Sequence, residues 1–111
     1  MGLDNYWKLP SSLDKHPTFD PPLNLWGGLC SHNGCESFRG KMYSEFCDVV
    51  MDLNLFQDLI TNTELKVGLQ KLSTWMKNNS TWEDHDENEI SDLFRMFNTY
   101  INLGASLESW Y

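Results

Sequence analysis

Basic residues are scarce in this sequence: eight lysines and arginines stand against sixteen aspartates and glutamates, which gives a formal net charge of −8. Binding to nucleic acid needs a concentrated basic surface that neutralises phosphates, so this charge balance argues against direct contact with DNA or RNA. An acidic chain instead suits solubility or a basic protein partner.

Long apolar runs are missing as well. No stretch approaches the roughly 18 consecutive apolar residues that suggest a transmembrane helix, so we expect no membrane contact. The opening MGLDNYWKLP has neither the basic start nor the apolar run of a signal peptide. The expected location is therefore cytoplasmic.

Cysteine is rare too: the chain has three, an odd number, and without an export signal free thiols are the default. Cys30, His32 and Cys35 lie close together in the sequence, as zinc ligands would. Their C-x-H-x2-C spacing, with Cys47 or His85 as a distant fourth ligand, matches no common zinc motif. We expect no metal and no cofactor, and zinc binding by these residues is the alternative that the spacing leaves open.

The residues that are present suit one globular domain. Apolar residues make up 41% of the 111 positions and aromatic residues 14%, enough for a hydrophobic core without disulfides. Helical spacing of apolar residues predicts three helices, and the aromatic start and tail predict two short strands that pair with each other. The expected fold class is α+β in a single domain over 1–111, with a mainly α domain as the alternative.

Local signals place these elements along the chain. Ser37 is typical of an N-cap, and Thr61 with Glu64 has the spacing of a capping box. Gly104 is a natural helix C-cap, and 54–60 fits either a helical turn or a short strand. The helices are expected over about 37–53, 61–77 and from between 82 and 89 to Gly104, and the strands over 2–8 and 105–111.

All four prolines fall in 9–24, which predicts an irregular, extended segment. Phe19 is the one aromatic residue within it, and we expect this side chain to anchor the segment to the core.

The glycine-rich stretch over 25–41, LWGGLCSHNGCESFRGK, is the densest group of chemically suggestive residues. It superficially resembles a nucleotide-binding P-loop. However, five residues rather than four separate Gly34 from Gly40, and Met42 follows Lys41 where Ser or Thr would bind magnesium. A nucleotide triphosphatase is therefore excluded.

A simpler anion site fits this stretch better. Backbone N–H groups at the start of the first helix, together with Arg39 and Lys41, would attract a negative group. The glycines would let the backbone approach a ligand, and Trp26 or Tyr43 would supply a stacking surface. The alternative is that the glycines only turn the chain and that Arg39 pairs with a carboxylate. The candidate ligand-binding residues are Trp26, Gly27, Gly28, Ser31, His32, Asn33, Gly34, Ser37, Arg39, Gly40, Lys41 and Tyr43.

Residues 82–92, WEDHDENEISD, hold six carboxylates and His85. Acidic residues in the first turn of a helix complement its dipole, and this is the simplest interpretation of the cluster. The alternative is an acidic face for a basic protein. A calcium-binding loop of the EF-hand type is excluded because the glycine and the terminal glutamate are not at the required offsets.

A nucleophilic mechanism would use Cys30, Cys35 or Ser37 with a histidine as the base. No sequence signature of a nucleophile surrounds them, so catalysis is less favoured than binding. A small hydrolase or transferase that uses His32 is the alternative.

The opening MGLDNYW, the FDPP turn at 19–22 and the GGLxSxxG…SFRGKxY pattern across 27–43 together resemble a group of small proteins from bacteriophage and other microbial viral genomes. The resemblance covers mainly 1–45, and SFRGKMY is its most specific part. Cys30 and Cys35 depart from the group's pattern, so thiol chemistry is not implied. The group has no settled activity, and the resemblance implies an accessory protein in the cytoplasm of a host cell.

These observations lead to one expectation: a non-enzymatic, phage-type accessory protein that inhibits or sequesters its target. The glycine-rich stretch and the SFRGK segment would bind a small anionic ligand or a host protein. The first alternative is an inhibitor that binds a basic host protein through the acidic residues of 83–92.

Overall fold

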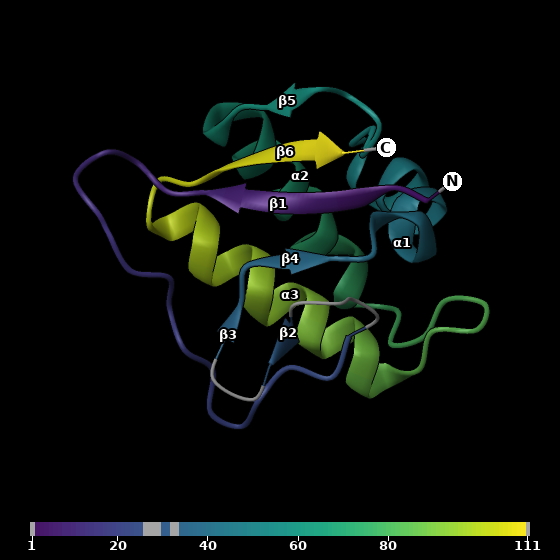
Figure 1. The fold of residues 1–111 in the computed structure, drawn as a ribbon. Helices are drawn as coiled ribbons and strands as arrows, with labels where there is room; N and C mark the ends of the chain where they lie inside the picture. The colour runs from purple at the N-terminus through teal and green to yellow at the C-terminus, as the bar shows by residue number, and fades with distance from the viewer. Residues whose placement is uncertain (1, 26–29, 32–33, 111) are drawn as a thin grey trace.

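The computed structural model describes residues 2–25, 30–31 and 34–110 (Figure 1). Four strands form an antiparallel sheet in the order β4-β1-β6-β5, and β2 and β3 form a separate two-stranded pair. Together with the helices, this sheet confirms the α+β class. The elements are β1 (Asp4–Lys8), β2 (Cys30–Ser31), β3 (Gly34–Cys35), β4 (Ser37–Phe38), α1 (Gly40–Phe46), the π-helix η1 (Cys47–Met51), β5 (Leu59–Ile60), α2 (Asn62–Met76), α3 (Glu87–Asn102) and β6 (Ser106–Trp110).

The two ends of the chain meet in the middle of the sheet. Strands β1 and β6 pair along five residues, from Asp4 opposite Trp110 to Lys8 opposite Ser106, which confirms the predicted pairing of the terminal strands. Side chains alternate along a strand, so Trp7 and its partner Leu107 both face inward and are buried. The pairing therefore supplies the inner surface on which the helices pack.

Helices α2 and α3 lie on the inner side of this sheet (Figure 1). The capping box predicted for α2 is present: the Thr61 side chain accepts from the Glu64 N–H, and the Glu64 carboxylate accepts from the Thr61 N–H at 3.1 Å. Gly104, with a φ of +88°, follows α3 in the left-handed conformation that glycine adopts readily. These local signals identified both helices correctly.

The helix predicted over 37–53 is wrong at its start. Ser37 is not an N-cap, because it pairs with Tyr6 while Phe38 pairs with Asn5, and the two residues form β4. Helix α1 begins at Gly40 and continues as the π-helix η1, whose end is followed by Asp52 in the left-handed conformation. The partner strand lies about thirty positions earlier in the chain, where no local pattern could reveal it. In 54–60, the ambiguous segment, a turn leads into β5.

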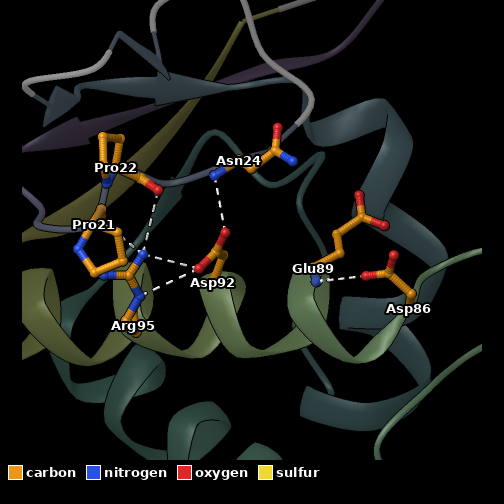
Figure 2. Close-up of polar contacts among 7 residues, drawn as sticks. All are labelled: Pro21, Pro22, Asn24, Asp86, Glu89, Asp92 and Arg95. Atoms are coloured by element: carbon orange, nitrogen blue, oxygen red, sulfur yellow. Dashed lines mark hydrogen bonds and ion pairs between the residues drawn. The ribbon is translucent and has the colours of Figure 1, made fainter.

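The proline-containing segment runs irregularly from β1, as predicted, and buried Phe19 anchors it. Polar contacts also attach it to α3 (Figure 2). Arg95 Nη2 donates to the Pro21 carbonyl at 2.9 Å, and the Asn24 N–H donates to Asp92 Oδ2 at 2.9 Å. Asp92 and Arg95 also pair with each other at 2.9 Å, so one helix face holds the segment.

Gly40 allows β1 and α1 to approach closely. A methyl group at this position would overlap the buried Asn5 Oδ1, and the Asn5 side chain is held by a 3.0 Å hydrogen bond from Nδ2 to the Leu55 carbonyl. Gly40→Ala should lower the free energy of unfolding by about 1–3 kcal/mol through overpacking. Helix propensity alone would give the opposite sign, a gain of up to about 1 kcal/mol.

Urea unfolding of purified Gly40→Ala checks this prediction. Gly2→Ala is the control, because its new methyl would meet only the movable guanidinium of Arg39. A Gly40→Ala variant as stable as the wild type would contradict the close contact.

The capping box of α2 generates a pH-dependent prediction. The hydrogen bond from the Thr61 N–H, followed by those from the Gln57 and Thr61 side chains, lowers the pKa of the Glu64 carboxyl. The ionised Glu64 carboxylate therefore stabilises the folded protein fully above the pKa that Glu64 has in the unfolded chain. This stabilisation is lost as the pH falls through the lower pKa that Glu64 has in the folded protein. Glu64→Gln should melt below the wild type at neutral pH, and the difference should shrink in acid.

Thermal unfolding at neutral and acidic pH measures both effects. Glu45→Gln removes an exposed carboxylate that has no hydrogen bond among the described residues, and it should change the melting temperature little. A constant difference between Glu64→Gln and the wild type across this pH range would contradict the assignment.

Candidate functional site

Much of the predicted ligand-binding loop lies outside the described residues: this applies to Trp26, Gly27, Gly28, His32 and Asn33. The predictions that Trp26 stacks on a ligand and that His32 binds or catalyses therefore stay predictions. Ser31 and Gly34 do have a described backbone, in which they are opposite each other in the β2–β3 pair.

In the described part of the loop, one of the two cations expected at the anion site already has a partner. Arg39 Nη1 lies 3.4 Å from Asp4 Oδ1, so the guanidinium has a carboxylate partner, as the alternative interpretation of this stretch expects. Lys41 is exposed, whereas Ser37 and Gly40 are buried. Only one of the two predicted cations is therefore without an ion-pair partner among the described residues.

The N–H groups at the start of α1 are also engaged. The Lys41 N–H donates to the Leu3 carbonyl at 3.0 Å, and the Met42 N–H donates to the Arg39 carbonyl at 3.0 Å. Tyr43 is fully buried, so its ring is not at the surface where a ligand would stack. The N–H groups of Lys41 and Met42 are therefore already used within the protein.

A better-formed arrangement lies at the turn before α3, which we call the acidic turn (residues 82–87). Two hydrogen bonds close its first four residues, from the Trp82 N–H to the His85 carbonyl at 3.0 Å and from the His85 N–H to the Trp82 carbonyl at 2.8 Å. Glu83, between them, has a φ of 49°. Asp86 is the N-cap of α3 and accepts from the Glu89 N–H at 2.8 Å (Figure 2). The predicted role of acidic residues at this helix start is thus confirmed.

A buried polar network fixes the acidic turn to the core. Tyr43 Oη donates to Glu89 Oε2 at 2.7 Å, and His85 Nδ1 lies 2.8 Å from Glu89 Oε1. The His85 and Glu89 side chains are only 9% and 13% exposed. A buried carboxylate is stable only with such partners, so Glu89 connects α1, α3 and the turn at one point.

Aromatic rings enclose the same histidine. The Tyr43 ring lies 5.1 Å from the His85 ring, and Trp82 stacks parallel to His85 at 6.2 Å. Phe46 contacts Trp82 edge-on at 5.5 Å. The four-residue spacing of His85 and Glu89 at a helix start is a local signal of their contact, but no local pattern indicates that Tyr43 joins them.

The acidic side chains of the turn point to solvent. Glu83, Asp84, Asp86 and Glu87 are all exposed. Among the described residues, Glu83, Asp84 and Glu87 have no ion-pair partner, while Asp86 caps α3. The turn therefore presents a concentrated negative charge from a hydrogen-bonded backbone.

The described residues give little support to a metal site, a nucleophilic cysteine or a membrane-spanning helix. The side chains that the structure describes, those of 2–25 and 36–110, include no group of three or more His, Cys, Asp or Glu arranged to hold a metal ion. The alternative zinc site on Cys30, His32 and Cys35 lies outside them and stays a prediction. Burial raises the pKa of the Cys47 thiol to about 12, so this cysteine is not a nucleophile at neutral pH. No helix in the same ranges is long and apolar enough to cross a membrane.

Tyr43→Phe tests the buried network. Removal of the hydroxyl leaves Glu89 without one of its two donors, which should lower the free energy of unfolding by about 1.5–3 kcal/mol. The amide protons of Trp82 and His85 should also exchange faster with solvent. Chemical unfolding and hydrogen exchange measure the two effects.

Tyr6→Phe is the matched control, because the Tyr6 hydroxyl has no hydrogen bond among the described residues. Equal stability losses for Tyr43→Phe and Tyr6→Phe would argue against a specific role of the Tyr43 hydroxyl.

Comparison of the chain with family models, with curated proteins and with solved structures finds no match. The resemblance to phage proteins therefore stays a prediction, and the geometry of the acidic turn is the strongest indication of function.

Proposed function

We propose that this chain is a non-enzymatic binding protein whose acidic turn docks onto a basic surface of a protein partner. The observation that carries the proposal is the exposure of four carboxylates within five residues, on a turn whose histidine is buried and hydrogen-bonded to α3. By occupying a basic site on its partner, such a protein would inhibit or sequester it.

Rigidity supports this assignment. A binding surface that is already ordered loses less conformational entropy on association than a mobile one does. The paired Trp82 and His85 backbones and the Tyr43–Glu89–His85 network hold the turn in place before any partner arrives. Less of the electrostatic attraction is then offset by the loss of conformational entropy, so the net affinity is higher.

The charge of the whole chain supports the same assignment. A net charge of −8 attracts a cationic surface from a distance and raises the association rate, while the local cluster selects the orientation. The same charge opposes binding of a small anion near Arg39 and Lys41, where Arg39 already pairs with Asp4. The acidic turn is therefore preferred to the SFRGK segment as the binding site.

The test compares two variants of equal net charge. One carries Glu83→Gln, Asp84→Asn and Glu87→Gln in the acidic turn, and leaves the helix cap Asp86 intact. The other carries three neutralisations of exposed acids elsewhere, namely Asp14→Asn, Glu45→Gln and Asp48→Asn. The probe is an immobilised peptide rich in lysine and arginine, with a glutamate-rich peptide as the blank.

The turn variant should associate with the basic peptide about tenfold more slowly than the wild type, and its rate should depend less on salt. The control variant should lose much less. Equal losses in the two variants would mean that only net charge matters, and would contradict a site at the turn. Absence of wild-type binding to the basic peptide at low salt would contradict the proposal as well.

A further inference from the structure

The sheet has a second surface that the proposed function does not use. Alternation along the strands directs Asn5, Trp7 and Leu107 toward the helices, and directs their neighbours to the opposite side. Helices α2 and α3 both lie on the inner side (Figure 1). We call the opposite side the outer face; its exposed and half-buried residues are Asp4, Tyr6, Lys8, Leu59, Ser106, Glu108 and Trp110. Ser37, opposite Tyr6, is on the same side but is buried.

The outer face exposes a cluster of apolar side chains. Trp110 is 63% exposed and packs edge-on against Tyr6, with ring centroids 5.8 Å apart. Leu59 on the neighbouring strand and Phe56 in the turn before it are also exposed. Among the described residues, seven large apolar side chains are exposed, and the strand register places two of them, Leu59 and Trp110, on this face. An apolar concentration of this kind marks an interaction surface.

Charge distinguishes the outer face from the rest of the molecule. Lys8 Nζ lies 3.5 Å from Glu108 Oε1, and Arg39 Nη1 lies 3.4 Å from Asp4 Oδ1, so two bases balance two acids around the apolar cluster. Asp58, which precedes Leu59, adds one acid at the edge. The chain as a whole carries −8. This surface is therefore close to neutral on a strongly acidic protein.

The near-neutral charge of the outer face favours a second copy of the chain as its binding partner. Two copies of a chain with eight excess negative charges repel each other on most approaches, and the repulsion is smallest where the local charges cancel. A basic partner would instead be drawn to the acidic turn.

The β5 edge of the sheet is less suited to such a contact. Strand β5 has only two residues, and Gln57 Nε2 already donates to the Leu59 carbonyl at 2.7 Å. A short edge with an engaged carbonyl offers little to an added strand. We therefore propose that the chain forms a homodimer in which the outer faces of two copies pack against each other, with Trp110 at the centre.

Sedimentation equilibrium of the full chain over a wide concentration range tests the proposal. The wild type should approach twice the 13.0 kDa mass of one chain as concentration rises. Trp110→Ala should raise the dimer dissociation constant at least about tenfold, because buried tryptophans at interface centres contribute most of the binding energy. Val67→Ala, an exposed apolar residue on α2, is the control and should leave the constant unchanged.

Lys8→Glu provides a second, independent readout. It converts the balanced face into an acidic one, so it should weaken the dimer by a factor that decreases at high salt. Circular dichroism checks that each variant remains folded. A wild type that stays monomeric at every concentration overturns the proposal, as does a dimer that neither Trp110→Ala nor Lys8→Glu weakens. A complex with a different protein through this face, in place of the dimer, overturns it too.

Discussion

The pairing of β1 with β6 is the constraint on which the rest of the structure depends. It joins the two ends of the chain in the centre of the sheet and sets which side chains face the helices. A shift of one residue would expose Trp7 and Leu107 and bury Tyr6 and Glu108. The pairing closes nearly the whole chain into a loop, so its entropic cost must be offset by packing that forms at the same time.

That packing centres on the contact between β1 and α3. Trp7 stacks on Tyr100 at 4.6 Å and meets Phe97 edge-on at 5.3 Å. With α3 oriented by the strand in this way, the two ends of the helix contact different parts of the chain. Its C-terminal half accepts the proline-containing segment through Tyr100 and His16, whose Oη and Nδ1 lie 2.9 Å apart. Its first turn holds the acidic turn through Glu89.

The surface of the protein consequently offers two kinds of contact. The acidic turn is charged and rigid, and its attraction to a basic partner is long-ranged and sensitive to salt. The outer face of the sheet is apolar and nearly neutral, so a contact there depends on close packing of Trp110 and its neighbours. Electrostatic attraction would drive association at the acidic turn, whereas apolar packing would drive it at the outer face. A substitution in one surface should therefore leave binding at the other unchanged.

The sequence alone determined the elements whose causes are local. The capping box of Thr61 and Glu64, the glycine after α3 and the aromatic residues of the terminal strands each act within a few residues, so a pattern reveals them. Only the tertiary structure decided that Ser37 joins a strand and that Tyr43 reaches Glu89, 46 positions away. Such contacts depend on which surfaces meet once the chain has folded, and that information resides in the packing of the whole molecule.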